Sequence, residues 1–170
     1  MKRKNLFPLN KIPYLKNKAY REKNCIFCKI LENSEEVTGL VIHHGRHASI
    51  TLNLYPYNPG HLMIFPHRHV IDIRDLNFDE EQEILILTKA SLDMIEGEYG
   101  TGSFNLGYNL GKDSGASIDH IHLHIVPRYP NETGFIDIIA GAKLIVEDPK
   151  KTHMRLKEKI PAYLKKYLNS

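Results

Sequence analysis

The segment Asp119–Val126 constrains the fold of this chain more than any other, because it alternates histidines with aliphatic residues. Successive side chains of a β-strand point to opposite faces, so His120, His122 and His124 would share one face and the aliphatic residues the other. Such a strand packs its apolar face on a core and turns three imidazoles, each about 6–7 Å from the next, toward a cleft. The sequence therefore predicts a half-buried strand that carries a functional site.

Two chemistries use a row of imidazoles. Neutral imidazole is a common metal ligand, and it is also a nucleophile that forms a transient bond to phosphorus. A glycine-rich loop, 111–115, precedes the row, and Lys112, Ser114 and Ser117 lie in or near it. Glycines let backbone N–H groups approach a phosphate, and the lysine and serines add charge and donors. The loop favours the phosphate interpretation over the metal one.

Short apolar stretches separated by turn residues predict the other elements. We expect strands at 38–44 and 47–54 that form a hairpin at Gly45, and further strands at 61–65, 103–109 and 142–146. The best helix is 79–99, with acidic residues in its first turns and glycines at its end. A final helix begins at Pro149, and Pro161 is a candidate interruption. The expected class is α+β: a mostly antiparallel sheet of about five strands, one long helix and a C-terminal helix.

The length and charge of the chain bound its class. Its 170 residues, 42% hydrophobic and 25% charged, suit one domain with tails. We expect a basic arm at 1–24, a catalytic domain at 25–148 and a helical extension at 149–170. A net charge of +3 does not indicate a nucleic-acid partner, and the basic ends are interpreted as solvated tails. Two cysteines, no apolar signal region and no run near ~20 apolar residues favour a cytoplasmic protein without a membrane span.

The stretch Gly115–Arg128 resembles the signature of the histidine-triad (HIT) family, in which three histidines alternate with apolar residues. Three further segments agree: Cys25–Cys28, the run Asn53–Ile64 with its Tyr-Pro-Tyr, and Arg68–Val70. Together with the run 105–111, they resemble the branch that contains diadenosine polyphosphate phosphorylases and hydrolases. The resemblance spans residues 25–130, and it implies a HIT-like fold, a nucleotide substrate and a homodimer, often with one continuous sheet.

The resemblance also implies roles for individual residues. His122 would be the nucleophile that becomes nucleotidylated, and His124 would hydrogen-bond phosphate oxygens near the leaving group. The α-phosphate pocket would be lined by Asn109, Gly115 and Ser117, with Lys112 and Ser117 stabilising the charge that develops on oxygen. Two positions depart from the family. Asn53 stands where many relatives have a ribose-binding Asp, and Ala116 stands where many hydrolases have a Gln that contacts the phosphate chain.

A structural zinc site is the second expectation. In zinc-bearing members of the family, a cysteine pair and two histidines bind the metal, and they correspond here to Cys25, Cys28, His69 and His120. Structural Zn²⁺ favours four nitrogen and sulfur ligands, so this set is chemically complete. The alternative is two free thiols with unrelated histidines. His61, at the start of a strand, is interpreted as structural, and His67 as a possible competitor for the ligand position of His69.

The expected activity is cleavage of a nucleoside polyphosphate at its α-phosphate through a nucleotidyl-histidine, by a hydrolase or a phosphorylase. A nucleoside phosphoramidate hydrolase is a related alternative. Two alternatives of other classes stay open at this point: a metallohydrolase that uses the histidine row as metal ligands, and a non-catalytic, zinc-stabilised nucleotide-binding or interaction protein.

Overall fold

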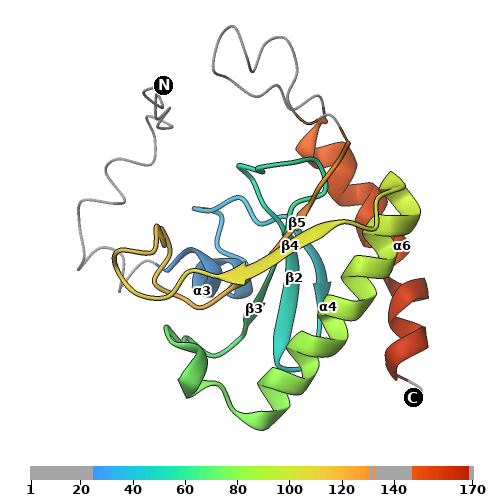
Figure 1. Cartoon of the computed structure of the whole chain (residues 1–170). Helices are drawn as coiled ribbons and strands as arrows, with labels where there is room; N and C mark the ends of the chain where they lie inside the picture. Colours follow the sequence, from blue (N-terminus) through green and yellow to red (C-terminus); the bar gives the residue numbers. More distant parts are fainter. Residues whose placement is uncertain (1–24, 131, 133–146, 169–170) are drawn as a thin grey trace, which may run out of the picture.

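The computed structural model of the protein describes residues 25–130, 132 and 147–168, and Figure 1 shows a single sheet with helices packed on it. The first three strands follow one another, the last two lie between the two long helices, and both long helices come after the first three strands. The elements are α3 (Ile26–Leu31), β1 (Val41–His44), β2 (Ala48–Leu52), β3 (Leu62–Pro66), the short η2 (Ile73–Asp75), α4 (Phe78–Tyr99), β4 (Phe104–Tyr108), β5 (Leu123–Pro127) and α6 (Pro149–Leu168).

All neighbouring strands of the sheet are antiparallel, in the order β1-β2-β3-β5-β4. The strand β5, which carries the end of the histidine row, therefore lies between β3 and β4. Met63 is paired with His124, and Gly107 lies opposite His124 on the other side. Because paired residues share a face, this register decides which side chains meet the histidines.

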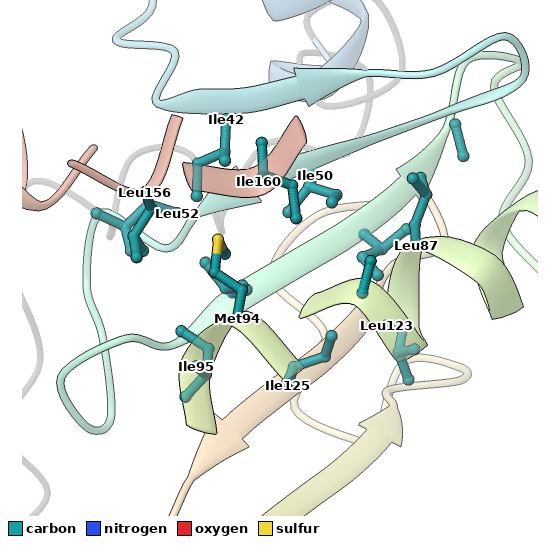
Figure 2. Packing of buried hydrophobic residues seen from close by; sticks show 14 of the residues in the cluster. Ile42, Ile50, Leu52, Leu87, Met94, Ile95, Leu123, Ile125, Leu156 and Ile160 are labelled. Carbon is teal, nitrogen blue, oxygen red and sulfur yellow. The ribbon is translucent and has the colours of Figure 1, made fainter. Parts of the chain in front are cut away.

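One face of the sheet is covered by α4 and α6 and forms the main core. Figure 2 shows Met94 and Ile95 of α4 converging with Leu156 of α6 on aliphatic side chains of the strands. Alternate residues of β5, Leu123 and Ile125, point into this core. Burial of these side chains supplies about 1.5–3 kcal/mol each. It also fixes which face of β5 carries His124.

The helix α4 has the ends that its sequence predicts. Asn77 accepts a hydrogen bond from the Glu80 backbone, and the Glu80 carboxylate accepts one from the Asn77 backbone, which together make a capping box. At the other end Gly100 adopts φ 67°, a left-handed conformation that glycine adopts without strain. Glu83, one turn into α4, accepts backbone hydrogen bonds from residues 46–48 and so holds the β1–β2 hairpin against the helix.

The C-terminal helix α6 runs through Pro161 without ending there, so the expected interruption does not occur. Buried Leu156, Ile160 and Leu164 hold the helix on the core on both sides of the proline, whose own side chain is exposed. Gly97 of α4 lets the Tyr163 hydroxyl approach its backbone, where a Cβ would clash. His153 Nε2 donates to the Val41 carbonyl at 2.7 Å, so α6 covers the β1 edge of the sheet.

The predicted α+β class, the hairpin, the long helix and the C-terminal helix are confirmed. Several strands are shorter than expected, and the largest difference is at β5, which begins at Leu123. His120 and His122 therefore lie before the regular strand rather than within it. The expected basic arm at 1–24 and the expected strand at 142–146 lie outside the described residues. Within the part of the chain that is described, neither long helix has the uninterrupted apolar length that a bilayer crossing requires.

Candidate active site and metal centre

The three histidines lie on the face of the sheet opposite the main core, but they do not share one environment. A second buried cluster covers part of this face: Phe27 and Ile30 of α3 pack on Met63 and Phe65 of β3. His120 and His122 are buried beside this cluster, whereas His124 is partly exposed. The row therefore runs from the interior to the surface.

His122 is only 5% exposed, and its ring lies edge-on to Phe27 at 5.2 Å between centroids. Strict strand alternation predicts instead that all three rings face a cleft. The regular strand begins only at Leu123, and ahead of it the rings of both His120 and His122 lie edge-on to Phe27 of α3. The Nδ1 atom of His122 lies 2.8 Å from the His120 carbonyl oxygen. A carbonyl only accepts hydrogen bonds, so Nδ1 carries the proton and Nε2 carries the electron pair.

His124 is held by His61, a histidine that the sequence alone indicates as merely structural. His61 Nε2 lies 3.0 Å from His124 Nδ1, and the Tyr57 backbone N–H donates to His61 Nδ1 at 3.1 Å. Since His61 Nδ1 accepts, its proton is on Nε2 and is donated to His124 Nδ1. The proton of neutral His124 is thereby placed on Nε2. Asn109 Nδ2, which lies 3.4 Å from Nε2, is also a donor, so the two atoms do not hydrogen-bond to each other in this tautomer.

Burial lowers the pKa of His61 to about 3, and repulsion from His124 and His122 acts in the same direction. His61 is thus neutral near pH 7, as the hydrogen-bond chain requires. The backbone pattern could have indicated this role, because Met63 pairs with His124 and His61 shares the face of Met63. That register joins residues about sixty positions apart and is not visible in the local sequence.

Asn53 lies close to this chain of hydrogen bonds. Its side-chain oxygen accepts from the Tyr55 backbone at 2.9 Å, and its amide nitrogen lies 3.3 Å from His61 Nδ1. Both ends of the amide therefore contact the protein. The ribose-binding role of Asn53 stays a prediction.

An open cleft of about 470 Å³ adjoins His124, with a volume in the range of small-molecule sites. Of the expected substrate-binding residues its lining includes Asn109, but not Lys112, Gly115 or Ser117. Those three lie in the loop that precedes His120, where Lys112 and Gly115 are exposed and Ser117 is partly buried. Gly115 adopts φ 84°, and a Cβ on it would meet no atom within 4 Å, as expected of a loop that is open to a ligand.

The four expected metal ligands, Cys25, Cys28, His69 and His120, come together at one point. Their ligand atoms all lie within 4.8 Å of one another. Cys25 Sγ is 3.4 Å from His120 Nδ1, Cys28 Sγ is 3.3 Å from His69 Nδ1, and Cys28 Sγ is 3.8 Å from His120 Nδ1. A tetrahedral zinc ion with usual bond lengths separates its ligands by about 3.5 Å, so the set fits such an ion.

Surrounding contacts orient this cluster. His120 Nε2 donates to the Pro66 carbonyl at 2.9 Å, which leaves the electron pair of Nδ1 directed at the cysteines. Burial raises the pKa of the Cys28 thiol, and nearby Cys25 raises it further, so a bound cation is what would favour the thiolate. Next to His69, Arg68 forms a two-bond ion pair with buried Glu80 of α4 and anchors the ligand-bearing loop.

The three imidazoles of the row do not converge on one metal position. The Nδ1 atoms of the three rings point to the cysteines, to the His120 carbonyl and to His61, respectively. Among the described residues, the grouping of possible metal ligands takes only His120 from the row. This geometry favours the nucleophile interpretation of His122 over the metallohydrolase alternative.

Residues 34–131, more than half of the chain, match the HIT domain family. The chain belongs to this family, as the triad predicts. The matched region includes His69, all three histidines of the row and both sides of the cleft, whereas Cys25 and Cys28 precede it.

The chain is similar to two named relatives. It is 42% identical over 120 residues to the AP-4-A phosphorylase of Mycobacterium tuberculosis, covering 70% of this chain and 61% of that protein. It is 33% identical over 94 residues to the bis(5'-adenosyl)-triphosphatase of Saccharomyces cerevisiae, covering 55% of this chain and 46% of that protein. The chain therefore spans less than two thirds of the length of either relative.

The fold is shared with a solved Zn-bound histidine triad family protein from Mycobacterium smegmatis. The two structures superpose with a TM-score of 0.67, covering 82% of this chain and 95% of that one, at 20% identity. At this identity the likeness shows the HIT-like α+β fold alone.

Proposed function

We propose that the protein is an enzyme that cleaves nucleoside polyphosphates, of the diadenosine polyphosphate class, at the α-phosphate through a nucleotidyl-histidine at His122. The observation that carries this proposal is the hydrogen bond from His122 Nδ1 to the His120 carbonyl. It fixes the neutral tautomer whose Nε2 is the nucleophilic nitrogen. The names of the two relatives, an AP-4-A phosphorylase and a bis(5'-adenosyl)-triphosphatase, support the same substrate class.

The reaction proceeds in two displacements. His122 Nε2 attacks the α-phosphorus; an N–P bond forms, and the bond from that phosphorus to the bridging oxygen of the leaving phosphate breaks. His124 Nε2–H, aligned by His61, donates a hydrogen bond to the departing oxygen. An acceptor then attacks the same phosphorus, the N–P bond breaks, and His122 returns to its starting state with its electron pair restored.

The loop before the row completes the phosphate site in this proposal. Lys112, Ser117 and backbone N–H groups around Gly115 stabilise the charge on the phosphate oxygens, and Asn109 contributes its amide from the end of β4. Because His122 is buried, a bound α-phosphate requires a small outward movement of the side chains around the ring. The dry surroundings strengthen the electrostatic contacts once the phosphate is in place.

Inorganic phosphate is the acceptor that we favour. The relative with the higher identity is named AP-4-A phosphorylase, and Ala116 lacks the amide that many hydrolases of the family carry. With phosphate as acceptor, diadenosine tetraphosphate yields ADP and ATP. With water as acceptor, it yields AMP and ATP.

We also propose that Cys25, Cys28, His69 and His120 bind a structural Zn²⁺. Bound there, the ion would hold α3 to the loop after β3 and to the segment that leads into β5. Its role would be to link these segments of the chain, and the separations between the four ligand atoms suit a tetrahedral ion. No step of the reaction uses it.

Two measurements test the catalytic proposal. Protein mixed with diadenosine tetraphosphate and quenched is expected to carry an adenylate on His122 by mass spectrometry. Product analysis with and without phosphate identifies the acceptor. The variant His122→Asn is expected to lose the adduct and to lower kcat by about 10⁴-fold or more, because it removes the nucleophile.

His44→Asn is the matched control, since His44 is an exposed histidine of β1. It is expected to keep the activity of the unmodified protein. Full activity of His122→Asn would exclude the covalent mechanism. Nucleotide binding without cleavage of any dinucleoside polyphosphate would instead support the non-catalytic binding protein.

A further inference from the structure

The open cleft extends from His124 away from the buried histidines, along β4 and β5, and contains groups that the mechanism above does not use. Its walls include Tyr57, Asn105, Arg128 and Glu132. The sequence analysis assigns no role to any of these four residues. The cleft is therefore a second compartment of the site, on the side of His124 that is remote from His120.

Arg128 is the one cation that lines this cleft among the described residues, and its guanidinium is held in place on two sides. Nε and Nη2 donate to the two oxygens of Glu132 at 2.8 and 2.9 Å, and Nη1 donates to Asn105 Oδ1 at 2.8 Å. Glu132 is itself anchored by the Tyr129 backbone N–H at 2.7 Å. These bonds engage three of the five guanidinium N–H groups, so one N–H on each terminal nitrogen stays available for a further acceptor.

The strand geometry aligns Arg128 with His124. His124, Val126 and Arg128 are alternate residues, and the antiparallel ladder continues to Arg128, whose N–H donates to the Ser103 carbonyl at 2.8 Å. Four residues of strand span about 13 Å. A fixed, half-exposed cation thus lies down the cleft from the histidine that faces the leaving oxygen.

An aromatic side chain lies at the His124 end of the same cleft. The Tyr57 ring stacks on His61 at 5.0 Å and 29°, and it is 62% exposed. Because His61 fixes its inner side, the exposed ring is held as a surface on which a planar group can stack. An anchored guanidinium and a supported aromatic ring in one cleft suit a ligand that carries both anionic phosphates and a base.

We propose that this Arg128 cleft is the subsite for the leaving portion of the substrate, the phosphates and second nucleoside beyond the scissile bond. This inference rests on the proposed function and adds that the enzyme selects substrates by their leaving group. Arg128, oriented by Glu132 and Asn105, binds the leaving phosphates, and Tyr57 contacts the second nucleoside. Substrates with a small neutral leaving group do not use the cleft.

The test compares two substrates that share the adenylate and differ in the leaving group: diadenosine tetraphosphate and adenosine 5'-phosphoramidate. The measured quantity is the ratio of their kcat/KM values. Arg128→Gln is expected to lower this ratio about 10- to 100-fold, as loss of a charge-assisted hydrogen bond to phosphate predicts. Arg128→Lys, which keeps the charge but not the two-sided geometry, is expected to lower it less.

Arg74→Gln is the matched control. Arg74 forms the same kind of two-bond pair, with Asp72, in η2 outside the cleft, and its replacement is expected to leave the ratio unchanged. An unchanged ratio in Arg128→Gln, with both substrates still cleaved, overturns the leaving-group subsite alone. If the unmodified protein cleaves neither substrate, the proposed function itself fails.

A second measurement needs no variant and so does not depend on the folding of one. Inorganic tripolyphosphate is expected to compete with diadenosine tetraphosphate on the unmodified protein at least about tenfold more strongly than sulfate, because it reaches both the α-phosphate site and Arg128. Equal inhibition by the two anions would overturn the proposal.

Discussion

At the scale of single residues, each histidine of the row uses one ring nitrogen for a hydrogen bond within the protein, and this bond determines what its other ring nitrogen can do. The Pro66 carbonyl directs His120 Nδ1 to the cysteines, and the His120 carbonyl leaves the electron pair of His122 on Nε2. His61 makes His124 a donor at Nε2. Three chemically identical side chains thus become, in our proposal, a metal ligand, a nucleophile and a hydrogen-bond donor.

The buried His61 links folding stability to pH. The pKa of His61 is about 3 in the folded protein and about 6.5 in an unfolded chain, so only the unfolded state takes up its proton as the pH falls below 6.5. The stability contribution is complete above pH 6.5 and is lost as the pH falls toward 3. Between pH 6.5 and 4.5 the free energy of unfolding is expected to fall by about 2 kcal/mol through this group.

The measurement is urea unfolding at several pH values for the unmodified protein and for His61→Gln, which does not titrate. The variant is expected to be less stable at pH 7 but to lose about 2 kcal/mol less between pH 6.5 and 4.5. His44→Gln, an exposed replacement, serves for comparison. Parallel pH profiles for the unmodified protein and His61→Gln would contradict the assignment.

What the sequence predicted at this scale followed from local motifs and from the family resemblance. The zinc ligands could be selected because zinc-bearing members of the family indicate which two of the ten histidines accompany the cysteine pair, and the four side chains do meet. The role of His61, the burial of His122 and the anchored Arg128 depend on contacts between residues distant in sequence, which no local pattern contains.

At the scale of elements, the six-residue helix α3 is too short to be stable alone, so its place depends on what it contacts. Phe27 stacks on Phe65 of β3 at 4.2 Å, and the same helix presents Cys28 to His69. Packing and the proposed metal therefore hold α3 at the same place. Since Phe27 also contacts His122, the position of α3 affects the proposed nucleophile.

Removal of the metal is expected to loosen this element. Zinc analysis of the purified protein should give about one ion per chain, and Cys28→Ser or a strong chelator should lower Tm by about 10 °C. His67→Asn is the matched control, because His67 is near His69 in sequence but bonds Ser49 instead. Absence of zinc from the unmodified protein, with Tm unaffected by the chelator, would show that the four side chains do not form a zinc site.

The sequence predicted the bounds of an element well where the hydrophobic period and the residues that start or stop the element indicated the same positions. The helix α4 begins within one residue of its expected start because acidic first-turn residues and a glycine stop bound a helical period. The sequence places the start of β5 four residues too early, because the alternation of histidines with aliphatic residues begins ahead of Leu123, where the pairing of β5 with β3 and β4 begins. Ahead of Leu123, His120 contacts Cys25 and His122 packs on Phe27, and these contacts replace the strand pairing.

At the scale of the whole molecule, the two edges of the sheet differ. The β1 edge is covered by α6, which bonds the Val41 carbonyl through His153. The β4 edge has exposed residues at its centre, and Leu106 is 48% exposed there. An uncovered edge strand with an exposed leucine is a template for strand pairing. We therefore propose that two copies of the chain join their β4 strands into the continuous sheet that the family resemblance implies.

In such a dimer a two-fold axis brings each Leu106 close to its own copy, so Leu106→Glu places like charges together and removes apolar contact. We expect the unmodified protein to be a dimer by light scattering and Leu106→Glu to raise the dimer dissociation constant at least about 100-fold, which corresponds to a loss of about 2.7 kcal/mol. Met154→Glu, at an exposed apolar residue of α6, makes the same chemical change away from β4 and should stay dimeric. A monomeric unmodified protein, or equal effects of the two variants, would mean that β4 is not the interface. In that case the Arg128 cleft, which β4 and β5 line, would be formed by one chain alone.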